Sequence, residues 1–115
     1  MKHRGSCHCG KVAYEVEGDI NGAMSCNCSI CARSGALLWF VPGDKFRLLT
    51  DANDLADYQF NKHVIHHRFC KNCGIRSYAE GVDGKGNKMA AINLRCIEGL
   101  DLDAIPVRKF DGKSL

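Results

Sequence analysis

Short runs in which apolar and polar residues alternate, separated by turn signals, extend along most of the chain. In residues 11–17, Val12, Tyr14 and Val16 occupy every second position, which is the period of a strand with one buried face. Such a strand has its other face in solvent, so these segments indicate sheets covered on one side. The same criteria predict further strands over residues 57–61, 63–69, 76–80 and 88–97.

The apolar run at residues 37–41 ends at a Pro-Gly pair, and residues 45–50 then resume a strand-like pattern. Because Pro followed by Gly marks a turn, we expect these two segments to form a hairpin. The glycine-rich stretch 81–87 predicts a second hairpin turn, exposed to solvent, and only residues 28–34 have a helical pattern. The whole chain, residues 1–115, is therefore expected to form a single mainly β domain with short helical turns.

The composition is that of an ordinary globular protein, with 45% hydrophobic and 25% charged residues in a chain of 115 residues. The 16 Lys and Arg residues and the 13 Asp and Glu residues give a net charge of +3. This balance is too mild to indicate a nucleic-acid partner, although it favours the approach of small anions. We therefore expect small-molecule partners and no nucleic acid.

No part of the sequence indicates a membrane or an export route. No segment reaches the roughly 18 consecutive apolar residues that a membrane-spanning helix requires. The first residues, 1–7, carry positive charge, but no apolar stretch follows them, so we expect no signal peptide. A cytoplasmic location without a membrane partner is the resulting expectation.

Eight cysteines are the most unusual feature of the composition. In a reducing compartment, thiols at this density hold metal ions more often than they form disulfides. Cys7 and Cys9, like Cys26 and Cys28, are one residue apart, so their side chains lie on the same side of an extended chain. Neighbouring thiolates repel one another unless a cation lies between them, which favours zinc over the alternative of a disulfide framework.

The cysteines form three motifs, with Cys96 standing alone. The motifs are Cys7-His8-Cys9-Gly10, Cys26-Asn27-Cys28-Ser29-Ile30-Cys31 and Cys70-Lys71-Asn72-Cys73-Gly74. The third has the form of a zinc knuckle, in which a glycine at positive φ lets backbone N–H groups point at the sulfur atoms. Two ligands do not complete a tetrahedral site, and the first motif, also followed by glycine, is the natural complement. A closed structural zinc site that adds folding free energy is therefore predicted at Cys7, Cys9, Cys70 and Cys73.

The alternative for the third motif is redox chemistry at Cys70 and Cys73. It is the weaker interpretation, because no thioredoxin-like βαβ pattern surrounds the motif.

The middle motif differs in kind, because Cys26, Cys28 and Cys31 supply three thiolates. Three protein ligands with an open fourth position are typical of a reactive zinc. The alternative is a structural site completed by a histidine, for which the candidates are His8, His63, His66 and His67. His66 and His67 are adjacent on a predicted strand, so they face opposite sides and only one of them could reach a given site.

A zinc ion held by three thiolates carries a net charge of −1, so it activates water less well than a three-histidine site does. It remains a good host for a soft fourth ligand, such as the sulfur of a substrate thiol. The middle motif therefore favours carbon–sulfur chemistry over hydrolysis.

Taken together, the motifs resemble the glutathione-dependent formaldehyde-activating enzymes, also called the centromere-protein-V/GFA domain family. The resemblance rests on Gly5-Ser6-Cys7-His8-Cys9-Gly10, on residues 26–31 followed by Ser34-Gly35-Ala36, and on Phe69-Cys70-Lys71-Asn72-Cys73-Gly74. It implies a β-tent fold with two zinc ions per chain, one on the first and third motifs and one on the middle motif. The implied activity is a carbon–sulfur lyase run in reverse, which condenses glutathione with formaldehyde.

By position, the resemblance makes Cys7, Cys9, Cys70 and Cys73 the structural ligands. It makes Cys26, Cys28 and Cys31 the ligands of the active-site zinc. A small thiol and a small aldehyde are the expected substrates, and Arg33, just after the middle motif, is the first candidate to contact a substrate carboxylate.

Two other functions are compatible with the motifs. One is a zinc module that binds protein or nucleic acid without catalysis, although the chain has no basic run interleaved with aromatic residues. The other is a methionine sulfoxide reductase, because Arg95-Cys96-Ile97 is similar to the nucleophile region of that zinc enzyme. Glu98 stands where that enzyme has asparagine, and the favoured interpretation of Cys96 is a small buried hydrophobic residue at the end of a strand.

Overall fold

The computed structural model describes residues 1–60 and 64–114. Within these residues the chain forms mainly strands, joined by short helical turns. The strands are β1 (Lys2–Ser6), β2 (Ala13–Glu17), β3 (Ala23–Cys26), β4 (Leu38–Pro42), β5 (Phe46–Leu48), β6 (Leu55–Tyr58), β7 (His66–Cys70), β8 (Arg76–Val82), β9 (Lys88–Asn93) and β10 (Val107–Phe110). The helical segments are α1 (Ser29–Ser34) and the 3-10 turns η1 (Gly43–Lys45), η2 (Ala52–Asp54), η3 (Leu94–Cys96), η4 (Leu102–Ala104) and η5 (Gly112–Ser114).

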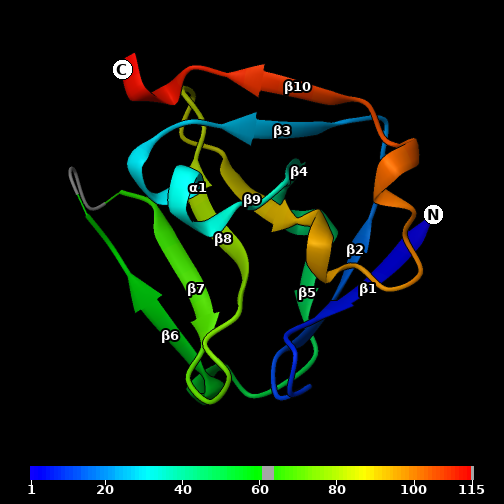
Figure 1. Cartoon of the computed structure of the whole chain (residues 1–115). Helices are drawn as coiled ribbons and strands as arrows, with labels where there is room; N and C mark the ends of the chain where they lie inside the picture. Colours follow the sequence, from blue (N-terminus) through cyan, green and yellow to red (C-terminus); the bar gives the residue numbers. More distant parts are fainter. Residues whose placement is uncertain (61–63, 115) are drawn as a thin grey trace.

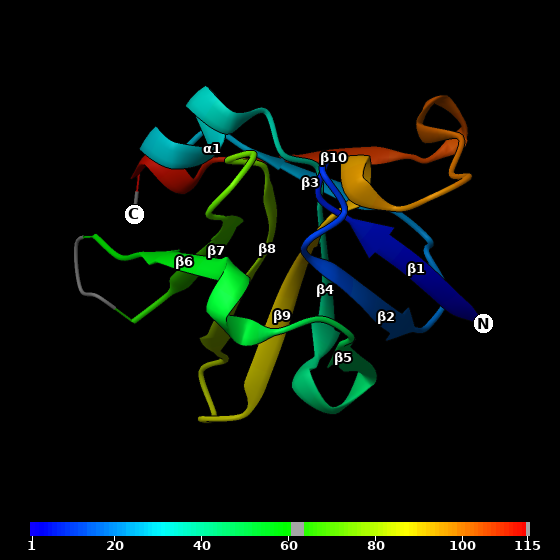
Figure 2. The same cartoon turned by 90° about the horizontal axis from the view of Figure 1, so that it is seen from below.

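The strands form two sheets (Figures 1 and 2). The smaller sheet has the order β1-β2-β5, and the larger one has the order β10-β3-β4-β9-β8-β7-β6. Neighbouring strands are antiparallel except for β10 and β3, which are parallel. Figure 2 shows β1 and β2 on one side of β4 and β9, with β6 and β7 on the other side. The expectation of a single mainly β domain is confirmed.

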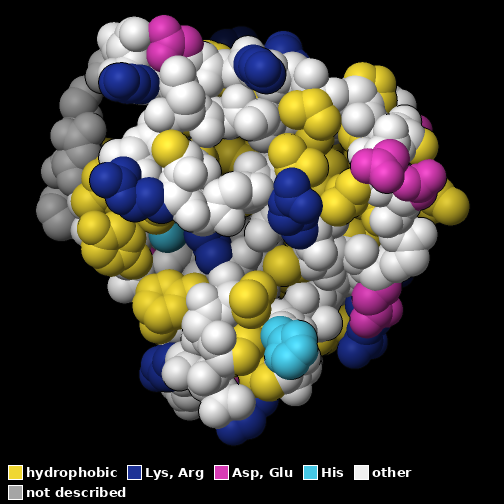
Figure 3. Space-filling model, viewed as in Figure 1, with side chains coloured by type: hydrophobic (Ala, Val, Ile, Leu, Met, Phe, Trp, Pro, Cys, Tyr) yellow, Lys and Arg dark blue, Asp and Glu magenta, His cyan; other side chains and the backbone are white. Residues whose placement is uncertain are grey.

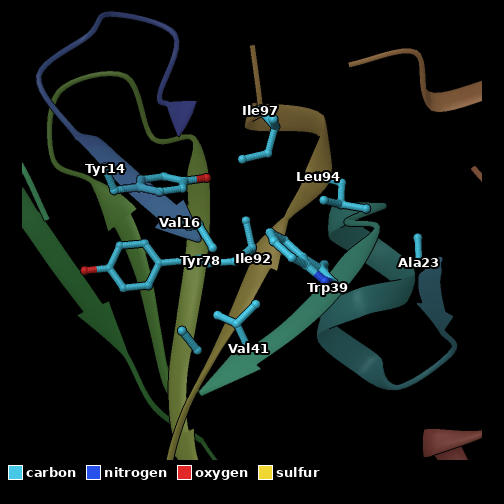
Figure 4. Close-up of a cluster of buried hydrophobic side chains, with 10 residues drawn as sticks. Tyr14, Val16, Ala23, Trp39, Val41, Tyr78, Ile92, Leu94 and Ile97 are labelled. Carbon is cyan, nitrogen blue, oxygen red and sulfur yellow. The ribbon is translucent and has the colours of Figure 1, made fainter. Parts of the chain in front are cut away.

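One hydrophobic core joins the two sheets (Figure 4). Its buried members are Tyr14, Val16, Ala23, Trp39, Val41, Tyr78, Ala90, Ile92, Leu94 and Ile97. A Cβ atom at Gly5 would lie 2.5 Å from the Tyr14 ring, so the small sheet can pack in this way only with glycine at that position. The Tyr14 hydroxyl donates to the backbone oxygen of Ser77 at 3.3 Å, which links the small sheet to β8 of the large one.

Most of the predicted strands are confirmed, with shifted ends. The segment 11–17 becomes β2, with Val12, Tyr14 and Val16 fully buried as the alternation requires. The other predicted strands correspond to β6, β7, β8 and β9, although 88–97 ends early and continues as η3. Positions 61–63 of the predicted strands lie outside the described residues.

The predicted hairpin over residues 37–50 is wrong. β4 pairs with β3 and β9 in the large sheet, whereas β5 pairs with β2 in the small one. Neighbouring β4 residues Leu38 and Trp39 are both buried, so β4 has apolar surroundings on both faces and lies in the interior of its sheet. The Pro-Gly signal does mark a turn, η1, but this turn carries the chain from one sheet to the other. The hairpin around 81–87 is confirmed, because β8 pairs with β9 across that turn.

The predicted helix is confirmed as α1, which begins one residue later than expected, with Cys28 as its N-cap. Gly35 ends it in the left-handed conformation, and its N–H donates to the backbone oxygen of Cys31 at 3.0 Å. Among the described residues, no helix has the length and apolar character needed to span a membrane.

His66 and His67 point to opposite faces of β7, as predicted. His66 Nδ1 lies 2.9 Å from a carboxylate oxygen of Asp57, whereas His67 is only 6% exposed and stacks on Phe60 with ring centroids 5.4 Å apart. Burial lowers the pKa of His67 to about 4, because a charged imidazole would lose its hydration there, and the Arg76 charge adds to this effect.

This depressed pKa predicts a pH-dependent stability. The usual pKa is 6.5, so between that value and about 4 the unfolded chain binds a proton at His67 that the folded chain does not. Stability is therefore lost as the pH falls. Between about pH 7 and about pH 5, the wild-type unfolding free energy should drop about 2 kcal/mol more than that of His67→Phe. Chemical denaturation at both pH values measures the difference, and equal losses in the two proteins would contradict the assignment.

Candidate metal centres

Four sulfur atoms from the first and third motifs come together at one end of the molecule. The Sγ atoms of Cys7, Cys9, Cys70 and Cys73 all lie within 4.8 Å of one another. The Cys9 sulfur is 3.6 Å from the sulfurs of both Cys7 and Cys70, and all of these cysteines are free thiols. The motifs that carry them are the β1–β2 and β7–β8 connections, both at the lower edge of Figure 1.

The spacing of these sulfur atoms fits a zinc ion. Four thiolates at about 2.3 Å from a tetrahedral zinc have sulfur atoms about 3.8 Å apart, close to the observed 3.6 Å. A disulfide would instead bring two sulfurs to about 2.05 Å. The donor set and its geometry therefore suit a closed four-thiolate site.

Tight turns position the ligands of this site. Gly10 and Gly74, the last residues of the two motifs, have φ of 84° and 79°, a left-handed conformation that residues with a side chain rarely adopt. The backbone N–H of Val12 donates to the Cys7 sulfur at 3.3 Å, and the N–H of Asn72 donates to the Cys70 sulfur at 3.4 Å. These are the N–H···S contacts that the knuckle pattern predicts. The cluster thus joins an end of the small sheet to an end of the large one.

The thiols of this cluster differ in acidity. Burial raises the pKa of Cys7 to about 11, whereas a hydrogen bond with Asn72 lowers that of Cys9 to about 6. The pKa of Cys73 is also lowered, first by the backbone N–H of Ile75. Thiols so close together cannot all ionise without a cation between them, and a divalent metal ion supplies that cation.

The three sulfur atoms of the middle motif form a second cluster. The Sγ atoms of Cys26, Cys28 and Cys31 lie within 4.8 Å of one another. Cys26 ends β3, Cys28 caps α1, and Cys31 is buried on α1 against Ala36 and Leu38. The N–H of Cys28 donates to the Cys26 sulfur at 3.4 Å. The sharp passage from strand to helix is what turns three sequence neighbours toward one point.

The thiols of the middle motif also differ in acidity, because burial and hydrogen bonding act on them unequally. Burial raises the pKa of Cys31 to about 12, an effect that Cys28 increases and Arg76 opposes. Burial also disfavours ionisation of Cys28, but hydrogen bonds, first from the backbone N–H of Cys31, outweigh it and lower that pKa. One thiol of the cluster is thus prepared to ionise and another is held neutral, and a divalent cation would bring both to the thiolate form.

Of the histidines proposed as a fourth ligand, those in the described part of the chain do not join this cluster. Among the described residues, no histidine nitrogen or carboxylate oxygen lies with the three sulfurs. His66 is paired with Asp57, and His8 is exposed on the first motif. His63 lies outside the described residues.

Two arginines lie near the helix that carries Cys31. Arg33, the candidate from the sequence, donates from Nη1 to the backbone oxygen of Ser29 at 2.9 Å, on the exposed surface of its own helix. Arg76, from β8, donates from Nη1 to the Ser34 hydroxyl at 3.2 Å, and its charge acts on Cys31. Arg76 comes only two residues after the third motif, but the sequence does not reveal its role, because its approach to the middle motif depends on the fold.

Cys96 lies outside both clusters, at the end of η3. Its side chain is half-buried rather than fully buried, and its sulfur lies 3.9 Å from the backbone oxygen of Arg76. Burial raises the pKa of this thiol, so little thiolate forms near neutral pH. This environment is unfavourable for a reductase nucleophile.

A cavity in the described part of the chain is separate from both clusters. It measures about 670 Å³, and no cysteine lines it. Its lining includes apolar residues such as Phe46, Leu55 and Met89. Among its charged lining residues, Arg68 and Glu80 are paired with each other at 3.1 Å.

The described part of this mainly β chain thus contains one four-sulfur and one three-sulfur cluster, each of which could hold a metal ion. Residues 2–108 match the sequence model of the family described as glutathione-dependent formaldehyde-activating enzyme, and the chain belongs to this family. The resemblance seen in the motifs is thereby confirmed. The fold is also similar to the crystal structure of a Rhodobacter sphaeroides protein, with a TM-score of 0.78 and 30% identity. That match covers 91% of this chain and 99% of the other.

Proposed function

We propose that this protein is a zinc-dependent carbon–sulfur lyase that works in the direction of synthesis, adding glutathione or a similar thiol to formaldehyde. The observation that carries the proposal is the cluster of Cys26, Cys28 and Cys31. It offers three sulfur ligands and, among the described residues, no fourth. The family's name supports glutathione and formaldehyde as the substrates. The four-cysteine cluster is the structural counterpart, so two zinc ions per chain are proposed.

Zinc at the middle cluster would stabilise a substrate thiol as the thiolate near neutral pH. The reaction is an addition, in which the sulfur forms a bond to the carbonyl carbon and the carbonyl π-bond electrons move to oxygen. The proton given up by the thiol is balanced by the proton that the new hydroxyl gains. Holding the two reactants side by side supplies several kcal/mol toward such an addition, so little acid–base machinery is needed.

Neither histidine of β7 is well suited to deliver that proton. His67 has its pKa lowered to about 4, so it is almost entirely neutral at pH 7, and His66 is engaged by Asp57. We propose that solvent supplies the proton, because Cys26 and Cys28 are only partly buried.

We propose Arg76, in place of Arg33, as the cation that helps to bind an anionic thiol. Arg76 lies beside Cys31 and Ser34, whereas Arg33 is engaged by the carbonyl of its own helix. A thiolate bound to a three-thiolate zinc adds negative charge, which a neighbouring guanidinium offsets. Figure 3 shows Lys and Arg side chains on the face over α1, with the acidic side chains toward the margins of the view. That distribution favours an anionic thiol such as glutathione.

Replacing zinc by cobalt makes the proposed binding step visible, because thiolate ligands to cobalt give a sulfur-to-metal absorption band. Titration of the doubly loaded protein with glutathione should increase this band by about one thiolate per chain. The Cys28→Ala protein should show no increase, because it lacks the middle site. An unchanged spectrum with glutathione and other small thiols would contradict the proposal and favour a zinc module without this chemistry.

A further inference from the structure

The segment 110–114 crosses the loop that carries Cys26 and Cys28, and Asn27 holds it there. The backbone N–H of Asn27 donates to the backbone oxygen of Phe110 at 3.2 Å. The Asn27 side chain donates from Nδ2 to an Asp111 carboxylate oxygen at 2.9 Å, and its Oδ1 accepts from the backbone N–H of Lys113, also at 2.9 Å. Every polar atom of the Asn27 side chain therefore has a partner in this segment.

The segment reaches this position through the parallel pairing of β10 with β3, in which Phe110 is the partner of Cys26. Directly after the strand, the backbone of Gly112 passes over the cysteines. A Cβ atom at Gly112 would lie 2.6 Å from the Cys26 sulfur and 3.3 Å from the Cys28 Cβ. A larger residue would have to displace the Cys26 side chain, so at Gly112 the main chain itself covers one side of the Cys26 sulfur. Residues 110–114 also lie outside the range 2–108 that matches the family.

We propose that residues 110–114 form one wall of the middle cysteine cluster and that Asn27 is the positioning residue that keeps this wall against Cys26. The wall restricts the movement of the Cys26 sulfur and closes one direction of approach to the cluster. A metal ion held there is consequently released slowly, and its exchangeable ligand has to approach from a side that Gly112 leaves open. The inference rests on the proposed function only in that the middle cluster binds a metal ion.

The hydrogen bond between Asn27 and Asp111 allows a test in which the amide and the carboxylate are exchanged between the two positions. In Asn27→Asp, the new carboxylate still accepts from the Lys113 N–H but can no longer donate, and it repels Asp111. In Asn27→Asp combined with Asp111→Asn, the new amide at position 111 donates to the new carboxylate at position 27. The oxygen of that amide still accepts from the Ser114 hydroxyl, as Asp111 does at 2.7 Å. The double variant thus restores the contact with its polarity reversed.

The measurement is the rate at which the cobalt-loaded protein releases metal to a chelator, followed through the sulfur-to-cobalt band. In Asn27→Asp, one of the two cobalt ions should leave about tenfold faster than in the wild type. In the double variant, release should return to within about twofold of the wild-type rate. The slower cobalt ion, at the four-cysteine cluster, and the melting temperature should stay unchanged in both variants.

Asn87→Asp is a matched control, because Asn87 makes the same kind of contact, from Nδ2 to a carboxylate oxygen of Asp83 at 3.2 Å, in the β8–β9 turn. It should leave both release rates unchanged. Gly112→Ala offers a second approach and should lower the cobalt content toward one ion per chain, because its Cβ meets the Cys26 sulfur. The proposal would be overturned if Asn27→Asp released cobalt at the wild-type rate or released both ions equally faster. It would also be overturned if the double variant did not recover the wild-type rate. The metal-release experiment contains no glutathione or other thiol, so its result is independent of the glutathione titration.

Discussion

Replacing Cys70 by alanine is expected to leave the chain unfolded at room temperature. The Cys70 side chain is 1% exposed, and its sulfur accepts backbone N–H groups from Asn72 and Cys73. Structural zinc contributes on the order of 10 kcal/mol to folding, which is comparable with the whole stability of a small domain. Loss of one of four ligands removes most of this contribution. Circular dichroism during heating, in the presence of zinc and a thiol reductant, measures the effect.

Cys9→Ala separates metal binding from packing. The Cys9 side chain is exposed, so shortening it removes almost no buried contact. If the four-cysteine cluster holds zinc, Cys9→Ala should nevertheless destabilise the protein nearly as much as Cys70→Ala does. Cys96→Ala is the control, because Cys96 is half-buried and belongs to neither cluster, and its melting temperature should change by only a few degrees. A Cys9→Ala protein with the melting temperature of the wild type would contradict a structural zinc at this position.

Cys28→Ala is expected to give the opposite result, a folded protein that holds about one zinc ion instead of two and has lost its thiol chemistry. Cys28 is only partly buried and caps a helix of six residues, so the core does not depend on it. A site with two remaining thiolates and no other described ligand nearby cannot retain zinc well. Elemental analysis together with the melting temperature measures both effects. Equal losses of stability in Cys28→Ala and Cys70→Ala would contradict the division into a structural and a reactive site.

The cysteine clusters could be predicted from the sequence because most of what determines them is local. Each motif places its sulfur atoms within a few residues of one another. Gly10 and Gly74 supply left-handed turns at the ends of two motifs, and Gly35 ends α1 in the same conformation. The pairing of the first motif with the third followed from the number of ligands that zinc requires. The strand periodicity was equally local, and for that reason β2, β7, β8 and β9 were found.

The features that could not be predicted depend on contacts between distant segments. A Pro-Gly turn does not indicate whether the next strand returns to its own sheet, so the path from β4 to β5 was wrongly predicted as a hairpin. All four side chains of β10 are exposed, so its sequence has no alternation that would have revealed the pairing with β3. The contacts of Asn27 with residues 110–114 and of Arg76 with α1 follow from that long-range packing.

The most direct test of the proposed activity is the exchange rate between free and thiol-bound formaldehyde. The addition of glutathione to formaldehyde also proceeds without a catalyst, so two-dimensional exchange NMR with isotope-labelled formaldehyde can compare the rate with and without protein. The proposed function predicts that catalytic amounts of the zinc-loaded wild type accelerate this exchange. Cys28→Ala, folded and retaining the four-cysteine site, should leave the uncatalysed rate unchanged. Equal rates with the wild type, with Cys28→Ala and without protein would contradict the assignment of the middle cysteines to catalysis of thiol addition.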